Sequence, residues 1–92
     1  MTARWTPTAL RDLEALHAFI SEDQPDRASS MVERILASIR SVERHPEMGR
    51  AGRVAGTRDL VVAPYVVVYR LKPERVELLA VIHDARKWPD AF

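Results

Sequence analysis

The chain has 92 residues, 47% of them hydrophobic and 29% charged, and this length and balance predict a single globular domain over residues 1–92. It contains no cysteine, which excludes a disulfide scaffold, a thiolate nucleophile and a zinc site built on cysteine. No apolar run is long enough to cross a membrane, and the N-terminus has no signal-peptide core. We therefore expect a cytoplasmic protein without membrane partners.

Charge is unevenly distributed along the chain. Residues 1–49 hold 6 basic and 8 acidic residues, whereas residues 50–92 hold 8 basic and 5 acidic residues, so the net charge changes from −2 to +3. Twelve of the 14 basic residues are arginine, whose planar guanidinium suits phosphate or carboxylate. The total charge of +1 does not by itself predict nucleic-acid binding. The basic second half is either a solvated surface or a surface for a partner.

The first half predicts a short strand followed by a helical hairpin. Residues 3–5 alternate between apolar and polar side chains, as in a strand. Thr6-Pro7 has the pattern of a helix start, and apolar residues then recur at helical spacing as far as Ile20. A second helix is expected to begin at Pro25 and to end at His45-Pro46, because the residue before proline disfavours the helical conformation.

The second half has the pattern of a loop followed by a sheet. The only glycines of the chain, Gly49, Gly52 and Gly56, lie within eight residues and predict a flexible loop. Three strands are expected after it: Arg58–Ala63, Tyr65–Leu71 and Val76–His83. The short connections between these strands make them antiparallel neighbours. Residues 84–92 are expected to form a tail.

These elements predict an α+β domain of two layers, in the order β-α-α-β-β-β. The apolar stripes of the two helices would pack on one face of a three-stranded antiparallel sheet. Alternation puts Tyr65, Val67 and Tyr69 on one face and Val66 and Val68 on the other, and it leaves open which face the helices cover. The remaining face would be open to a partner.

Five short motifs follow one another over about 85 residues. They are Trp5-Thr6-Pro7-Thr8-Ala9, Pro46 with Gly49-Arg50, Gly56-Thr57-Arg58-Asp59-Leu60, the strand Tyr65–Arg70, and His83-Asp84-Ala85-Arg86-Lys87-Trp88. In this order and spacing they resemble the RelE/ParE family of bacterial toxins from type II toxin–antitoxin modules. The fold that this resemblance implies agrees with the architecture expected above.

The family has two branches, so the resemblance implies one of two activities. The RelE-like branch consists of ribosome-dependent mRNA endonucleases, and the ParE-like branch of inhibitors of DNA gyrase. RelE-like enzymes typically have an arginine directly after the first tyrosine of the middle strand, where this chain has Val66. We therefore favour a ParE-like toxin that binds gyrase, with the endonuclease acting on ribosome and mRNA as the alternative. A third hypothesis is that the chain is a non-toxic relative that only binds its antitoxin.

The two activities need different residues. Cleavage of mRNA needs a base, an acid and cations for the phosphate, and its candidate catalytic residues are Arg58, His83 and Arg86. Inhibition of gyrase needs a binding surface, and tryptophan and arginine are common at binding hot spots. The candidate target-binding residues are then Arg58, Arg86, Lys87 and Trp88.

The resemblance also implies a cognate antitoxin and a toxin–antitoxin hetero-oligomer. The antitoxin is expected to wrap the groove between the hairpin and the sheet with apolar and acidic side chains. The candidate contacts are Leu13, His17, Phe19 and Arg70. No cofactor or metal is implied, because the three histidines lack metal-ligand spacing and the glycine loop lacks the ending of a P-loop. The sequence does not decide the oligomeric state of the chain itself.

Overall fold

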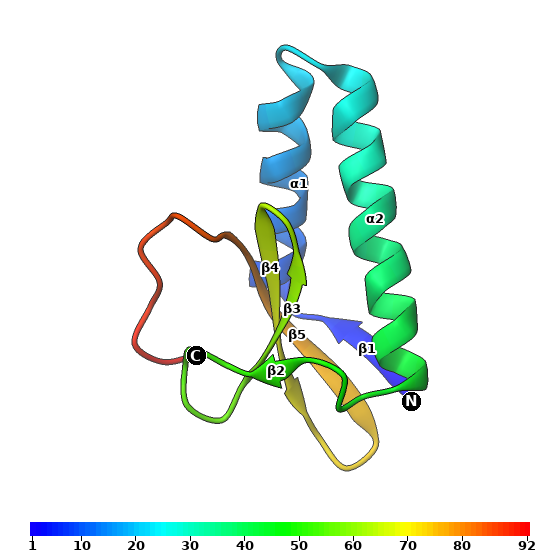
Figure 1. The fold of residues 1–92 in the computed structure, drawn as a ribbon, viewed down its shortest axis with the longest axis vertical. Helices are drawn as coiled ribbons and strands as arrows, with labels where there is room; N and C mark the ends of the chain where they lie inside the picture. Colours follow the sequence, from blue (N-terminus) through cyan, green and yellow to red (C-terminus); the bar gives the residue numbers. More distant parts are fainter.

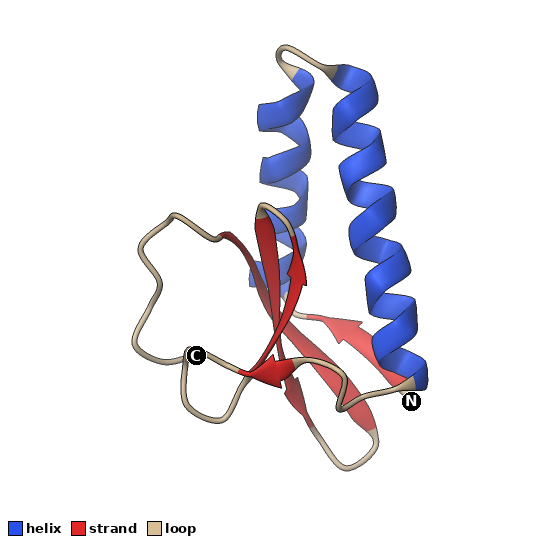
Figure 2. Cartoon of the chain, viewed as in Figure 1, coloured by secondary structure: helices blue, strands red, loops and turns tan.

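A computed structural model describes all 92 residues as two helices and five strands in two layers (Figures 1 and 2). The elements are β1 (Thr2–Trp5), α1 (Pro7–Ser21), α2 (Pro25–Arg44), β2 (Arg50–Ala51), β3 (Arg58–Val62), β4 (Tyr65–Leu71) and β5 (Arg75–His83). The hairpin of α1 and α2 covers one face of the sheet, and its connecting end extends beyond the strands (Figure 1). The α+β class is thus confirmed. Neither helix combines the length and apolar character needed to cross a bilayer.

The sheet has five strands in the order β1-β5-β4-β3-β2. Strands β3, β4 and β5 are antiparallel neighbours, as predicted. The sheet gains a strand at each edge, because β1 pairs in parallel with β5 and β2 pairs with β3 over two residues. The helical hairpin leads from β1 at one edge to β2 at the other, and the chain then returns through β3 and β4 to β5 beside β1. The sheet is therefore mixed and wider than the three antiparallel strands expected.

The start of α1 is fixed both to its own first turn and to the sheet. The Thr6 hydroxyl accepts a hydrogen bond from the backbone N–H of Ala9 at 3.2 Å and donates one to the carbonyl of Leu78 at 2.7 Å. Pro7 occupies the first helical position, where its missing N–H has no intrahelical partner to lose. One threonine thus caps the helix and attaches it to β5.

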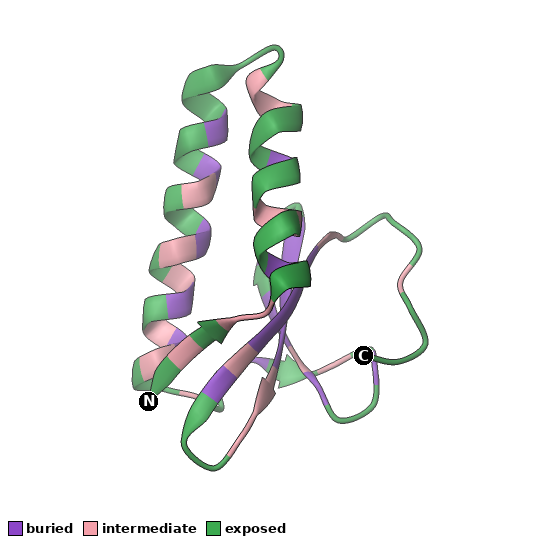
Figure 3. Cartoon of the chain, turned by 180° about the vertical axis from the view of Figure 1, so that it is seen from behind, coloured by how far each residue is buried: buried purple, intermediate pink, exposed green.

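The helices cover the sheet face that carries Tyr65, Val67 and Tyr69. These side chains join the larger core cluster, and the buried positions of α2, such as Ile35, recur along one side of the helix (Figure 3). A β-bulge at Leu79 interrupts the alternation of β5. A bulge adds one residue to one strand of a pair, so Val76, Leu78 and Val81 all face the helices while Leu79 faces the other side.

The second face of the sheet has a small core of its own. Val66, Val68, Leu79 and Ala80 are buried there, with Ile82 and Trp88 packed against them. Trp88 comes from the tail after β5, so part of the face that was expected to be open is covered by the chain itself. This contact between the tail and the sheet determines where the charged residues of the tail lie.

Candidate functional site

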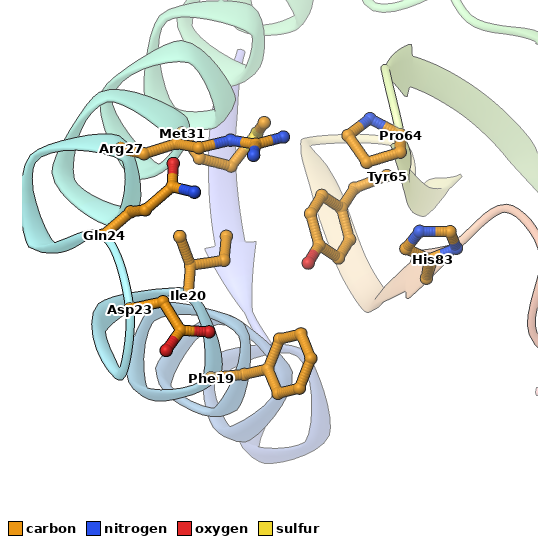
Figure 4. A pocket seen from close by; sticks show the side chains of 9 residues that line it. All are labelled: Phe19, Ile20, Asp23, Gln24, Arg27, Met31, Pro64, Tyr65 and His83. Carbon is orange, nitrogen blue, oxygen red and sulfur yellow. The ribbon is translucent and has the colours of Figure 1, made fainter.

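Two hollows meet at the connecting end of the hairpin, and they share Phe19, Tyr65 and His83. The first lies between the end of the hairpin and the turn from β3 to β4, with Tyr65 and His83 opposite Phe19 and Ile20 (Figure 4). The second lies between α1 and β5 and includes Arg86. Phe19 is 70% exposed, the most exposed large apolar side chain of the protein. Phe19 therefore offers an exposed apolar side chain to both hollows.

Register brings Tyr65 and His83 together, because they are paired on β4 and β5. Their rings meet edge to face with centroids 5.4 Å apart. His83 Nδ1 accepts a hydrogen bond from the backbone N–H of Ala85 at 3.1 Å. In the neutral ring the proton then lies on Nε2, so the one lone pair of His83 that could accept a proton is already engaged. This arrangement disfavours His83 as a general base.

Arg58 lies at the other end of the same strands. It is paired with Tyr69 on β4, four residues from Tyr65, which corresponds to about 13 Å along a strand. Its guanidinium donates to the carbonyls of Glu47 at 3.0 Å and Gly49 at 2.8 Å. The three candidate catalytic residues are therefore not assembled, since only His83 and Arg86 line a common hollow.

Tyr69 completes the attachment of the loop after α2. Its hydroxyl donates to the carbonyl of Pro46 at 2.8 Å and accepts from the backbone N–H of Gly49 at 2.9 Å. Burial raises the pKa of Tyr69, because an ionised hydroxyl would lose its hydration there. A Cβ at Gly49 would lie 2.5 Å from the Tyr69 hydroxyl, so this position requires glycine. The second tyrosine of the motif and Arg58 thus serve the fold of this loop.

The tail presents two free cations beside an anchored aromatic ring. Arg86 and Lys87 are exposed, whereas Trp88 is half-buried against the second face of the sheet. Arg53, from the loop before β3, lies over the indole of Trp88 with its Cζ 3.9 Å from the ring centroid, and it also pairs with Asp84 at 2.8 Å. Three of the four candidate target-binding residues therefore lie on one segment, and Arg58 lies apart from them.

A family model described as "ParE toxin of type II toxin-antitoxin system, parDE" matches residues 3–88. The chain belongs to this family of toxins. The resemblance inferred from the motifs is confirmed, and the match covers the tail as far as Trp88.

Curated relatives of the toxin are also toxins by name. A protein named "Putative toxin Y4kP", from Sinorhizobium fredii, is 42% identical over 97% of this chain and 94% of its own length. A protein named "Toxin RelE2", from Caulobacter vibrioides, is 33% identical over 89% of this chain and 93% of its own length. One of these two relatives thus has a name that refers to RelE.

Solved structures share the fold of the toxin. A chain of the chromosomal ParDE system of P. aeruginosa superposes with a TM-score of 0.80 at 24% identity, over 90% of this chain and 95% of that one. A chain of the RelBE2 toxin–antitoxin complex of Mycobacterium tuberculosis gives a TM-score of 0.63 at 30% identity, over 89% and 95% of the two chains. The two-layer architecture is therefore that of the ParE/RelE fold.

The four candidate antitoxin contacts of the toxin do not form one surface. Leu13 is half-buried against the core, and with the exposed His17 it lines a shallow hollow on the hairpin. Phe19 lies at the two hollows described above. Arg70 is 4.0 Å from a carboxylate oxygen of Glu77 and donates to the carbonyl of Phe92 at 3.4 Å.

Two residues that the sequence interpretation did not select organise this region. Asp12 on α1 accepts a hydrogen bond from the backbone N–H of Val81 at 3.0 Å, where β5 extends past its partner β1. Arg53 joins the loop before β3 to the tail, as described above. Neither has a local sequence signal, because each acts on a segment distant along the chain. No group of three or more histidine or acidic side chains could hold a metal ion.

Proposed function

We propose that the toxin acts in the cytoplasm by binding DNA gyrase through its C-terminal segment. The observation that carries this proposal is the pair of exposed cations, Arg86 and Lys87, next to the anchored ring of Trp88. Arginine and tryptophan supply much of the energy at protein interfaces. Arg58 contributes to this activity indirectly, since its guanidinium holds the loop after α2.

Three features support binding over RNA cleavage. Cleavage requires a base, an acid and cations around one phosphate. The lone pair of His83 is engaged by the N–H of Ala85, and Arg58 lies at the far end of β4. RelE-like enzymes typically have an arginine at the position of Val66. In this chain Val66 is buried on the second face of the sheet.

A ribosome-dependent mRNA endonuclease is the second candidate function. It is favoured by the hollow that joins Tyr65, His83 and Arg86, since a hydroxyl, an imidazole and a guanidinium can together act on a phosphate. The similarity to a protein named RelE2, and to a chain of the RelBE2 complex, also favours it.

A cognate antitoxin is the proposed partner that neutralises the toxin in a hetero-oligomer. The two structural relatives come from toxin–antitoxin systems, and one of them is a complex. Of the four candidate contacts, Phe19 is best suited to receive an apolar side chain of the antitoxin, because it is exposed beside two hollows. Leu13 and His17 are proposed contacts at the hollow on the hairpin, and Arg70 is a proposed contact at the other end of β4.

Replacing His83 with alanine is expected to leave toxicity intact, because a binding toxin needs no proton transfer from this ring. The measurement is growth during expression without antitoxin, together with primer extension on cellular mRNA, which should show no cuts within codons. His45→Ala, at an exposed histidine after α2, is the matched control. Loss of toxicity in His83→Ala alone, with codon-specific cuts by the unmodified toxin, would establish the endonuclease instead. Unimpaired growth with the unmodified toxin would favour the non-toxic relative.

A further inference from the structure

Arg53 contacts the start of β3, close to it in the sequence, and a tail segment about 30 residues further along the chain. Its backbone N–H donates to Asp59 Oδ2 at 3.3 Å. Its guanidinium donates to Asp84 Oδ1 at 2.8 Å and lies over the ring of Trp88, with Cζ 3.9 Å from the centroid. Asp84 and Trp88 are the two ends of a short segment that carries Arg86 and Lys87 between them. One side chain therefore holds both ends of the segment that displays the two cations.

The loop that carries Arg53 is itself firmly held. The Thr57 hydroxyl donates to the carbonyl of Val54 at 2.7 Å, and the backbone N–H of Gly52 donates to the carbonyl of Thr57 at 2.8 Å. A side chain at Gly52 would collide with Thr57, so the turn closes tightly. Val54 and Thr57 are buried. Arg53 thus projects from a fixed platform, as a positioning residue must.

The buried carboxylate of Asp59 strengthens this platform. Asp59 is 3% exposed and lies opposite Val68, on the face that Trp88 covers. Its Oδ2 receives the N–H of Arg53, whereas its Oδ1 has no partner. The buried carboxylate therefore fixes the backbone of the loop at Arg53.

The tail has few other attachments. Beyond the end of β5, the backbone N–H groups of Asp84 and Arg86 donate to the carbonyls of Pro64 and His83, and that of Ala85 donates to His83 Nδ1. Phe92 accepts a hydrogen bond at 3.4 Å from Arg70. Most of the tail is exposed, with a half-buried position at Trp88 (Figure 3). The backbone hydrogen bonds hold the turn after His83, and Trp88 packs on the sheet. Arg53 adds the side-chain contacts that connect Asp84 and Trp88, on either side of Arg86 and Lys87.

We propose that Arg53 is a positioning residue for target binding, because it clamps the segment 84–88 and so fixes the direction in which Arg86 and Lys87 point. This inference rests on the proposed function, in which that segment meets gyrase. Binding a target with a preordered segment avoids the entropy lost when a mobile one is ordered. Without the clamp the cations remain present but are dispersed over many orientations.

The rate of trypsin cleavage after Arg86 and Lys87 measures how often the segment 84–88 opens. This measurement needs no assumption about the target. When opening is fast, the cleavage rate follows the population of the open segment. Loss of a cation–π contact and an ion pair in Arg53→Ala should raise this rate about tenfold. Arg53→Lys should lie between the two, because it keeps the ion pair but loses planar stacking. Arg40→Ala, which removes an exposed arginine of α2, is the matched control and should cleave like the unmodified toxin.

Inhibition of gyrase supercoiling then tests the positioning role. For Arg53→Ala, the concentration that gives half inhibition should be about tenfold higher, at unchanged thermal stability. Exchanging the charges in the double variant Arg53→Asp with Asp84→Arg should recover part of the loss.

Equal cleavage rates in Arg53→Ala and Arg40→Ala would overturn the clamp. Faster cleavage with unchanged inhibition overturns the positioning role. If the unmodified toxin does not inhibit gyrase, the proposed function fails, and the cleavage rates still decide the clamp. If Arg53→Ala does not fold, Arg53→Lys and Asp84→Asn give the same comparison.

Discussion

Reversing both tail cations, in Arg86→Glu with Lys87→Glu, is expected to weaken gyrase inhibition by about a hundredfold while leaving the stability of the fold unchanged. Both side chains are exposed, and neither takes part in an ion pair. Trp88 is retained, so the second face of the sheet stays covered. The measurement is the toxin concentration for half inhibition of supercoiling, with thermal unfolding followed in parallel.

The matched control for the tail variant carries the same change of charge elsewhere. Arg40→Glu with Lys72→Glu also replaces one arginine and one lysine, on α2 and at the turn between β4 and β5. It should retain inhibition within about threefold, because charges away from an interface act mainly on the rate of encounter. An equal loss in both double variants would mean that overall charge, and not the tail, sets the affinity.

Replacing Tyr69 with phenylalanine is expected to lower the free energy of unfolding by about 1–3 kcal/mol, because two polar groups lose a buried partner. These are the carbonyl of Pro46 and the N–H of Gly49. For a small domain this is a considerable share of its total stability. Denaturant unfolding followed by circular dichroism gives the value.

Tyr65→Phe is the control for this substitution. Tyr65 is also buried on β4, but its hydroxyl makes no hydrogen bond within the protein. It should change the free energy of unfolding by less than about 0.5 kcal/mol, since no buried group loses a partner. Equal destabilisation by the two substitutions would contradict the role assigned to the Tyr69 hydroxyl.

The raised pKa of Tyr69 also predicts an alkaline loss of stability. Above pH 10.0, the ordinary pKa of a tyrosine, Tyr69 ionises in the unfolded chain before it does so in the folded protein. The unfolded state then binds fewer protons, so this contribution is fully present below pH 10 and declines as pH rises further. In Tyr69→Phe this part of the decline should vanish. The same alkaline slope in both proteins would show that other groups cause it.

Element bounds were predictable where a local signal fixes them. Pro25 and His45-Pro46 delimit α2, and the run of β-branched and aromatic residues from Tyr65 to Leu71, between Pro64 and Lys72-Pro73, defines β4 in full. The strand at residues 3–5 was also predicted, but its pairing and the short β2 were not predictable in the same way. β2 has only two residues and lies in a glycine-rich loop, and the parallel pairing of β1 with β5 joins the two ends of the chain. No local pattern encodes such a pairing, because its strands are far apart in sequence.

The candidate site was predictable in its residue types and less so in their contacts. The sequence interpretation selected Trp88, but not the sheet face that it covers or the Arg53 guanidinium above it. It also selected Arg58, whose guanidinium binds two backbone carbonyls. A sequence does not distinguish an arginine that holds a loop from one whose guanidinium is free to bind a partner. Only the contacts in the fold distinguish them.

Under the proposed function, the toxin acts as a stoichiometric binder of gyrase and not as a catalyst. Titration of purified toxin against a fixed amount of gyrase, with supercoiling as the readout, tests this most directly. We expect inhibition to rise as the toxin reaches and exceeds the molar amount of gyrase, and to disappear when the antitoxin is added. Undisturbed supercoiling at large toxin excess, together with cleavage of ribosome-bound mRNA by a small fraction of an equivalent, would contradict the account.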